Sequence, residues 1–194
     1  MSKIWFISDT HFFSENIIRY CNRPFANAAE MNEHIIKVWN ERVADDDDVY
    51  CLGDFVMHQS ENIPLVIPRL KGRIHLCRGN HDTRRKLSVL EQQPNIVEIK
   101  ELAYIQYKKL FFVACHFPMT NQDFLDMVVK DNSEVVCVHG HVHDKTPFFT
   151  EATHSFNVSV DVTPDYGPVC IDDIYERCKR HFIEKGVWRK EVVE

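Results

Sequence analysis

The sequence has no long apolar run, no low-complexity tract and no surplus of positive charge. Its longest uninterrupted apolar run, Leu110 to Cys115, has six residues, whereas about 20 are needed to cross a bilayer. No basic segment followed by a long apolar stretch opens the chain, so we expect a cytoplasmic protein with no membrane partner. The 29 acidic residues outnumber the 23 Lys and Arg residues and give a net charge of −6. This balance disfavours broad binding to duplex DNA, although it does not exclude a nuclease.

Cysteine pairs with metal-binding or redox spacing are also missing. The seven cysteines are odd in number and contain no C-x-x-C pair, and five of them lie in apolar, strand-like runs. We therefore expect small core residues in a reducing compartment rather than disulfides or a thiolate metal site. Histidine, by contrast, is abundant, with 11 residues in 194, and gives the first indication of chemistry.

The length and the apolar pattern predict one layered α/β domain over residues 1–194. Short apolar runs alternate with amphipathic segments, and 44% apolar residues are enough for a core that needs no disulfides. The runs expected to form buried strands are Ile4–Ser8, Val49–Gly53, Ile74–Arg78, Leu110–Cys115 and Val135–His139. Further strands are expected in Ile96–Tyr107 (one or two), His154–Val162 and Pro168–Ile171.

Helical patterns separate these runs. Asn27 and Glu30 form a capping-box arrangement at the start of the clearest helix. Its apolar residues recur at helical spacing, namely Met31, Ile35, Val38 and Trp39. A second helix is expected over Glu61–Leu70, which contains two prolines, and a closing helix over Asp172–Phe182.

Side chains of the kind that bind metal ions follow each of the first five buried runs. The segments are Asp9-Thr10-His11, Gly53-Asp54, Gly79-Asn80-His81-Asp82, His116 and Gly140-His141-Val142-His143. Open α/β sheets bind ligands at the carboxyl ends of their strands, so we expect these segments to meet. Residues two apart in an extended chain point to the same side, which allows Asp9 with His11, and His141 with His143, to act in pairs.

Seven of these side chains are candidate ligands: Asp9, His11, Asp54, Asn80, His116, His141 and His143. Oxygen and imidazole donors without sulfur suit Mn, Fe or Zn. Seven ligands are too many for one tetrahedral ion, but they suit two ions about 3.5–4 Å apart that share a carboxylate.

The five blocks resemble the calcineurin-like metallophosphoesterase superfamily, whose pattern is D-x-H, G-D, G-N-H-[DE], a lone H and G-H-x-H. All five are present in order between Asp9 and His143, about 70% of the chain. The surrounding text, including S-D-T-H-F, R-P-F and H-G-H-V-H, is similar to a compact bacterial and bacteriophage branch. Members of that branch read H-F-G-H where this chain has His11-Phe12-Phe13-Ser14, so Ser14 departs from the pattern without touching a ligand.

The resemblance implies a four-layer αββα sandwich of two mixed sheets flanked by helices. It also implies two divalent metal ions, with Mn the first expectation and Fe or Zn the alternatives. One ion would be held by Asp9, His11, Asp54 and His143, and the other by Asp54, Asn80, His116 and His141, with Asp54 bridging. The implied activity is hydrolysis of phosphodiesters or phosphomonoesters by in-line attack of a metal-bridging hydroxide. We assign His81 to protonate the leaving oxygen, and Asp82 to orient the His81 ring.

Three rival functions compete with this prediction. A DNA or RNA nuclease would use the same residues, and steep salt dependence of nucleic-acid binding would favour it. A non-catalytic metal-binding scaffold is disfavoured because His81 is present. A metallo-β-lactamase-like hydrolase would use H-x-H-x-D-H early in the chain, which His141-Val142-His143-Asp144-Lys145 fits poorly.

Three other features are interpreted as structural. The run Asp45–Asp48 precedes a strand and is expected to be a solvated loop at the opposite end of the sheet from the metals. Arg84, Arg85 and Lys86 are expected at a solvent-facing helix start, with contact to a substrate phosphate as the alternative. Plain structural roles are expected for His34, His58, His75, His154 and His181, whereas for His139 strand burial and support of a ligand are equally favoured.

The substrate is expected to be a phosphate ester of a small molecule or nucleotide. Selection of its organic group is assigned to the loops Phe12–Arg23, Val56–Ile63, Met119–Asp126 and Lys145–Thr153. No motif in these loops identifies the leaving group, and none bears on the oligomeric state.

Overall fold

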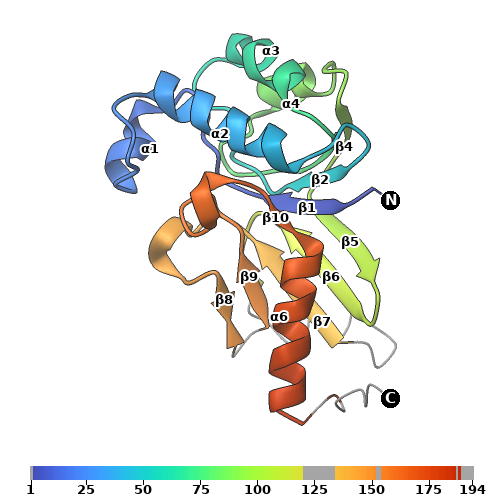
Figure 1. Cartoon of the computed structure of the whole chain (residues 1–194). Coiled ribbons are helices and arrows are strands. Elements are labelled where there is room, and N and C mark those ends of the chain that lie inside the picture. Colours follow the sequence, from blue (N-terminus) through green and yellow to red (C-terminus); the bar gives the residue numbers. More distant parts are fainter. Residues whose placement is uncertain (1, 120–133, 152–153, 187, 189–194) are drawn as a thin grey trace.

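Two five-stranded sheets lie face to face in the computed structural model, which describes residues 2–119, 134–151, 154–186 and 188 (Figure 1). The first sheet has the order β10-β1-β2-β3-β4. Its strands are β1 (Ile4–Ile7), β2 (Asp48–Cys51), β3 (Arg73–Cys77), β4 (Ile96–Lys100) and β10 (Val169–Cys170). The second sheet has the order β5-β6-β7-β9-β8. Its strands are β5 (Leu102–Tyr107), β6 (Leu110–Cys115), β7 (Glu134–His139), β8 (Phe149–Thr150) and β9 (Ser155–Asn157).

Both sheets are mixed, and their central strands are parallel. In the first sheet β1 to β4 run parallel and β10 is antiparallel to β1. In the second, β6, β7 and β9 run parallel, whereas β5 and β8 are antiparallel edge strands. The carboxyl ends of the parallel strands of each sheet therefore lie at one edge.

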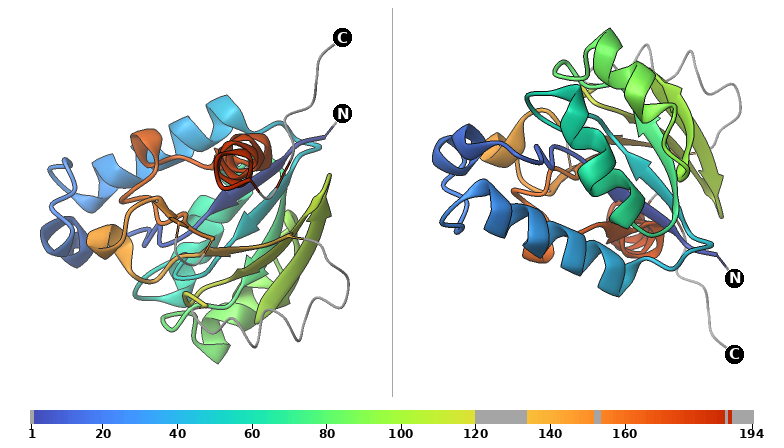
Figure 2. Two further views of the ribbon diagram at one scale, coloured as in Figure 1. Left: turned by 90° about the horizontal axis from the view of Figure 1, so that it is seen from below. Right: turned by 90° about the horizontal axis from the view of Figure 1, so that it is seen from above.

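Helices flank the sheets, as the views from below and above show (Figure 2). The helices are α1 (Glu15–Tyr20), α2 (Ala28–Arg42), α3 (Ile63–Val66), α4 (Arg84–Leu90) and α6 (Ile171–Glu184). Helices α2, α3 and α4 cover the outer face of the first sheet, where Trp39 of α2 is fully buried in one apolar cluster. A second cluster fills the space between the sheets, where Phe6 stacks on Phe112 with ring centroids 6.1 Å apart, and α6 adds Phe182 to it. The predicted sandwich of two mixed sheets flanked by helices is confirmed. No helix in the described part of the chain is long and apolar enough to span a membrane.

The predicted cap of α2 is present. The Asn27 side chain accepts a hydrogen bond from the Glu30 backbone N–H at 2.9 Å. The Glu30 carboxylate in turn accepts one from the Ala26 backbone N–H at 2.7 Å. These two bonds satisfy donors that would otherwise be unpaired at the helix start.

Two expectations about the elements were wrong in detail, and a third had left the choice open between one strand and two. The expected helix over 61–70 is broken into a 3₁₀ turn, α3 and a second 3₁₀ turn, because Pro64 and Pro68 lack the N–H groups that a continuous helix needs. The alternating stretch Ile96–Tyr107 divides at Glu101 into β4 and β5, which belong to different sheets. The segment Phe12–Arg23, expected as a loop, contains the short helix α1, whose first turn is capped by Ser14 Oγ at 3.3 Å from the Ile17 nitrogen.

Candidate metal centre

The structure brings the predicted strand ends to one place. Asp9 and His11 follow β1, Asp54 follows β2 and Asn80 follows β3 in the first sheet. His116 follows β6, and His141 and His143 follow β7 in the second sheet. Four of the seven side chains are buried, so bulk water does not compete for their ligand atoms: Asp9, His11, Asp54 and His116.

One carboxylate oxygen lies between two groups of donors. Asp54 Oδ2 is 3.6 Å from His11 Nε2 and 3.5 Å from His116 Nε2. The other oxygen, Asp54 Oδ1, accepts a hydrogen bond from the His81 backbone N–H at 2.8 Å. This bond fixes the rotation of the carboxylate and leaves Oδ2 directed at both histidines.

The first donor group consists of Asp9, His11 and His143, whose ligand atoms lie within 4.8 Å of one another. Asp9 Oδ2 accepts a hydrogen bond from the His141 backbone N–H at 2.9 Å. Within the described part of the chain, Asp9 Oδ1 and both ring nitrogens of His11 are buried without a hydrogen-bond partner. Buried polar atoms normally have a hydrogen-bond partner. This cluster of ligand atoms without one therefore fits a site for a bound cation.

The second group consists of Asn80, His116 and His141. His116 Nε2 lies 2.8 Å from Asn80 Oδ1, and His141 Nδ1 lies 2.9 Å from the same oxygen. The two ring nitrogens are 3.2 Å apart. The opposite nitrogen of His116, Nδ1, contacts the Leu52 carbonyl oxygen at 2.8 Å, which directs Nε2 toward the group. Asp9, Asp54 and His116 also lie within 4.8 Å of one another, so the two groups adjoin.

Burial shifts the titration of two members of the first group, Asp9 and His11, toward their uncharged forms. Loss of hydration raises the pKa of Asp9 to about 6 from an ordinary value of 3.8. The same loss lowers the pKa of His11 well below 6.5, and the nearby Arg23 charge adds to that shift. A neutral imidazole is the form that binds a metal ion, so His11 is held ready as a ligand.

Backbone strain is concentrated at the same residues. Positive φ values occur at Asp9 (56°), His11 (49°), Asp54 (53°), His141 (69°) and His143 (50°). Left-handed backbone costs a residue other than glycine about 1–3 kcal/mol and persists where the surrounding structure enforces it, often at functional sites. The strain supports a functional role for these strand ends beyond their packing.

Close approach of the loops requires glycine at two positions. A Cβ at Gly79 would lie 2.3 Å from Asp54 Oδ1, and one at Gly140 would lie 1.9 Å from Ser8 Oγ. Both glycines precede candidate ligands, so they allow the loop from each sheet to reach the centre.

A buried ion pair that the sequence patterns did not indicate supports His143. Asp161 Oδ2 accepts a hydrogen bond from His143 Nδ1 at 2.6 Å, which leaves His143 Nε2 for the centre. Arg23 holds Asp161 through two hydrogen bonds of 2.7 and 2.9 Å, and the Arg23 and Asp161 side chains are 0% and 1% exposed. Arg23 also donates to the Asp9 and Thr10 carbonyl oxygens. One guanidinium therefore positions the backbone at Asp9 directly and the His143 ring through Asp161.

The pKa values of Asp161 and His143 reflect these hydrogen bonds, and His143 must lose its Nε2 proton when it binds a metal ion. Burial opposes the charged forms, but the hydrogen bonds from His143 and Arg23 hold the pKa of Asp161 well below its ordinary value. Burial likewise opposes a charged His143, yet its bonds to Asp161 and Cys21 raise its pKa to about 10. The R-P-F text of the branch contains Arg23, but no local pattern links Arg23 to Asp161, which lies 138 residues further on.

His81 lies beside the centre and has an accessible ring. Its side chain is 49% exposed, and Nε2 is 4.0 Å from Asp54 Oδ2. Its backbone is fixed by the bond to Asp54 and by Lys86, whose amine donates to the His81 carbonyl oxygen at 3.0 Å. The ring can therefore reach a group bound at the centre.

Asp82 contacts the backbone of two loops. Its carboxylate accepts hydrogen bonds from the N–H groups of Asp54 and Gly79 at 2.9 Å and of Phe55 at 3.4 Å. None of the described bonds of Asp82 is to the His81 ring, so the orienting role predicted for Asp82 has no support in the geometry. Asp82 instead holds the loop after β2 against the loop after β3.

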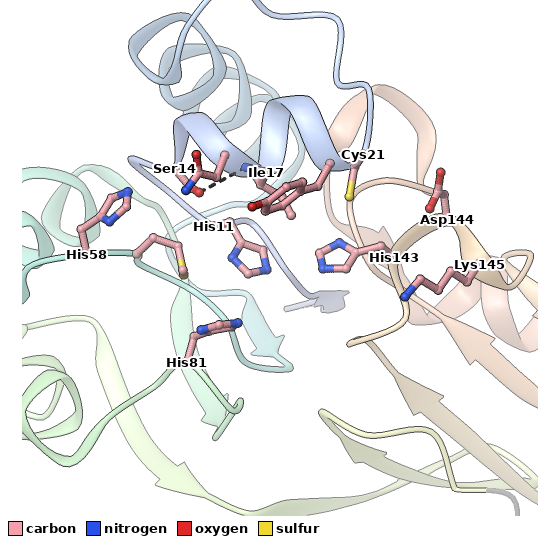
Figure 3. A pocket seen from close by; sticks show the side chains of 12 residues that line it. His11, Ser14, Ile17, Cys21, His58, His81, His143, Asp144 and Lys145 are labelled. Carbon is pink, nitrogen blue, oxygen red and sulfur yellow. Dashed lines mark hydrogen bonds between the residues drawn. The ribbon is translucent and has the colours of Figure 1, made fainter.

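A cavity of about 490 Å³ opens beside the first donor group (Figure 3). The rings of His11, His81 and His143 face it, and α1 forms the opposite wall. The residues that line it are His11, Ser14, Asn16, Ile17, Tyr20, Cys21, Met57, His58, His81, His143, Asp144 and Lys145. Three of the loops expected to select substrate therefore contribute, whereas residues 120–126 of the fourth lie outside the described residues. His58 was expected to be merely structural and is found in this lining.

The remaining polar features belong to neither donor group. Asp45–Asp48 lies at the start of β2, at the predicted opposite end, but Asp47 is buried rather than solvated. Asp47 accepts hydrogen bonds from the Lys3 and Ala44 backbone N–H groups and from Trp5 Nε1.

Arg84 and Arg85 are exposed at the start of α4, as favoured, whereas Lys86 is buried under His81. His139 is buried at the end of β7 with Nδ1 at 3.0 Å from the Gly140 carbonyl oxygen, which fits strand burial.

All seven cysteines are free, and six are buried, as expected. The exception is Cys21, which is half-buried at the end of α1. Its ligand atom lies within 4.8 Å of those of His143 and Asp161. A thiol is therefore adjacent to the centre, although no thiolate had been expected there.

Comparison with known proteins agrees with this geometry. The uncharacterized protein MJ1445 of Methanocaldococcus jannaschii is 39% identical over 193 residues, covering 96% of this chain and 94% of its own. The gene 66 protein of Mycobacterium phage D29 is 25% identical over 210 residues, covering 96% of this chain and 100% of its own. The crystal structure of AQ665 from Aquifex aeolicus, a protein of unknown function, has a TM-score of 0.71 at 27% identity, covering 91% of this chain and 100% of its own.

A two-sheet α/β fold with histidines and carboxylates gathered at its strand ends is the arrangement that the five motifs predicted for a metal-dependent phosphoesterase. The calcineurin-like phosphoesterase superfamily domain matches residues 2–158. The chain belongs to this superfamily, and the resemblance predicted from its five motifs is confirmed.

Proposed function

We propose that the protein is a dinuclear phosphoesterase that hydrolyses phosphodiesters in preference to phosphomonoesters. Asp9, His11, Asp54 and His143 would hold one divalent ion. Asp54, Asn80, His116 and His141 would hold the other. Asp54 would serve both ions, since its Oδ2 lies 3.6 Å from His11 Nε2 and 3.5 Å from His116 Nε2.

The observation that carries this proposal is the set of unpaired buried atoms at the centre. In the described residues, Asp9 Oδ1 and both nitrogens of His11 have no hydrogen-bond partner. Leaving such groups unpaired costs about 1–3 kcal/mol each, and bound cations would recover that cost. The donor set contains oxygen and imidazole nitrogen, which suits Mn, Fe or Zn, and of these we propose Mn²⁺.

When bound, a pair of divalent ions would supply Lewis acidity, both toward the phosphoryl oxygens and toward a water nucleophile. The chain's own residues fix the geometry of the reaction. The Asp54 carboxylate is held by the His81 backbone N–H, and the loops that carry Asp54 and Asn80 are joined through Asp82. Phosphoryl transfer depends mainly on such positioning and on charge stabilisation.

We assign His81 as the general acid. Its Nε2 lies 4.0 Å from Asp54 Oδ2, and its ring faces the cavity, so it can donate a proton to the leaving oxygen of a bound ester. A positioned acid contributes about 10²–10⁴-fold to a rate. This is the role that separates a hydrolase from a metal-binding scaffold with the same fold.

The test is cleavage of bis-p-nitrophenyl phosphate by protein reconstituted with Mn²⁺, Fe²⁺ or Zn²⁺. We expect turnover that EDTA abolishes and added metal restores. His81→Ala should keep the metal content and lose at least about 100-fold in kcat. His34→Ala is the matched control, since His34 lies on α2 against Phe25 and Tyr166, and it should behave like the wild type. Absence of cleavage with every metal would contradict the proposal.

A further inference from the structure

The cavity beside the first donor group has two chemically different halves. The floor consists of the rings of His11, His81 and His143. The wall formed by α1 contributes Ile17 and Tyr20. Met57 adds a further apolar side chain to the lining. An ester bound with its phosphoryl group on the floor would therefore place its organic group against apolar side chains.

Tyr20 is the unusual member of this wall. It ends α1, the residue is 78% exposed, and it borders the cavity. Exposed aromatic rings at the mouth of a site commonly stack with planar groups of a ligand, because such a ring offers a large rigid surface. Met57 is flexible and polarizable, which suits a planar partner as well.

Polar groups at the rim add hydrogen-bonding capacity without a strong charge. Asn16 and His58 provide donors and acceptors. Lys145 provides a cation, but Asp144 beside it carries the opposite charge. Among the described residues, the lining therefore lacks the continuous positive track that binds the backbone of a nucleic-acid strand.

The size of the cavity limits what fits. Its volume of about 490 Å³ lies within the range of about 300–1,000 Å³ that is typical of small-molecule sites. Such a space suits a ligand of roughly the size of one nucleotide. It exceeds what a phosphosugar alone would fill.

We infer that this cavity binds the organic group of the ester, and that this group is a planar aromatic ring system of nucleoside size. The inference rests on the proposed function for the position of the phosphoryl group. Because His81 lines the same cavity, the group bound there is the one that leaves with the proton from His81. Tyr20 stacks on its ring and is a specificity residue, whereas Asn16, His58 and Lys145 contact its polar edge.

Competition with bis-p-nitrophenyl phosphate tests the inference through a pair of ligands that differ only in the base. Adenosine 5′-monophosphate and ribose 5-phosphate share the phosphate and the sugar. We expect the nucleotide to inhibit about tenfold more strongly, since stacking of one base on an aromatic side chain is worth about that factor. Tyr20→Ala should reduce this ratio to about 1. The matched control is Tyr104→Ala, an exposed tyrosine of β5 away from the cavity, which should keep the wild-type ratio.

A second readout needs no catalysis. Cys21 lines the cavity and is the only cysteine of the seven that is not buried, so iodoacetamide should label it first. Adenosine should slow this labelling in metal-free protein, and ribose at the same concentration should not. Cys21→Ser should remove the label and so confirms the site of reaction.

The two readouts separate the inference from the proposed function. If bis-p-nitrophenyl phosphate is not cleaved with any metal but adenosine protects Cys21, the proposed function fails and the aromatic site stands. If the ester is cleaved but nucleotide and sugar phosphate compete equally, and adenosine gives no protection, the inference is overturned and the hydrolase stands. Inhibition by a single-stranded oligonucleotide far stronger than by the mononucleotide would also overturn it, in favour of a nuclease.

Discussion

Replacement of Asp161 provides a sharp test of how the first donor group is held. The Asp161 carboxylate accepts two hydrogen bonds from Arg23, one from His143 Nδ1 and one from Ser159 Oγ. Asp161→Leu removes all four acceptor contacts while keeping a side chain of similar size. Asp161→Asn keeps an oxygen that can still accept from His143 but removes the charge.

The expected loss of stability follows from the burial of the pair. Removing one partner of a buried ion pair costs about 3–5 kcal/mol, because the other charge stays buried. Arg23 retains the Asp9 and Thr10 carbonyl oxygens as acceptors, so we expect the lower end, about 3 kcal/mol. For a domain of this size 1 kcal/mol corresponds to about 2–4 °C, so the Tm of Asp161→Leu without metal should fall by about 6–12 °C.

The effect on metal binding is separate from the effect on folding. Loss of a group that orients a metal-binding histidine lowers metal affinity about 10–100-fold. Titration calorimetry should therefore show the highest Mn²⁺ affinity for the wild type, a lower affinity for Asp161→Asn and the lowest affinity for Asp161→Leu. The double variant Arg23→Met with Asp161→Leu contains no buried charge from this pair and should recover much of the lost Tm, but its metal affinity should stay low. Wild-type Mn²⁺ affinity in Asp161→Leu would refute the reasoning, as would recovery of affinity together with Tm in the double variant.

Three further predictions concern the loops, the acid dependence of folding and the cavity. Gly79→Ala should abolish binding of at least one metal ion and lower the Tm, because the added Cβ would lie 2.3 Å from Asp54 Oδ1. The control is Gly186→Ala, whose Cβ would meet nothing within 4 Å. Mass spectrometry should show an unchanged metal content for this control. Burial alone would raise the pKa of Asp47, but bonds from Lys3, Ala44 and Trp5 lower it below its ordinary value. The ionised Asp47 carboxylate therefore stabilises the fold fully above the unfolded-state pKa of about 4, and this stabilisation is lost as the pH falls below that value. In this acidic range the Tm of Asp47→Asn should decrease less steeply than the Tm of the wild type. An equally steep decrease in both proteins would contradict this. His58→Ala should raise KM for a nucleoside ester with little change in kcat, and an unchanged KM would remove His58 from the contact set.

The meeting of the seven candidate ligands at one place was predictable from the sequence, because these residues follow short apolar runs. A strand end leaves a recognisable local pattern, as in Val49–Gly53 before Asp54, and parallel strands bring such ends together. The seven candidate ligands could therefore be assigned to one edge of the sheets from the order of residues alone. The same reasoning predicted the α2 cap, because Asn27 and Glu30 act over one helical turn.

The parts that were not predicted depend on contacts distant in the sequence. Arg23 and Asp161 are 138 residues apart, and neither has a local pattern that indicates its partner. Asp47 is buried because Trp5, on the neighbouring strand, donates a hydrogen bond to it. A run of four aspartates in the sequence does not indicate this contact. The division of Ile96–Tyr107 between two sheets was also missed, because alternation predicts strands but not the sheet to which each belongs.

The central claim is that two ions share Asp54 at the meeting point of the two sheets. A crystal grown with Mn²⁺ and measured near the manganese absorption edge tests it most directly. We predict two anomalous peaks about 3.5–4 Å apart, one beside Asp9, His11 and His143 and the other beside Asn80, His116 and His141. A single peak, or none near these side chains, would contradict the account.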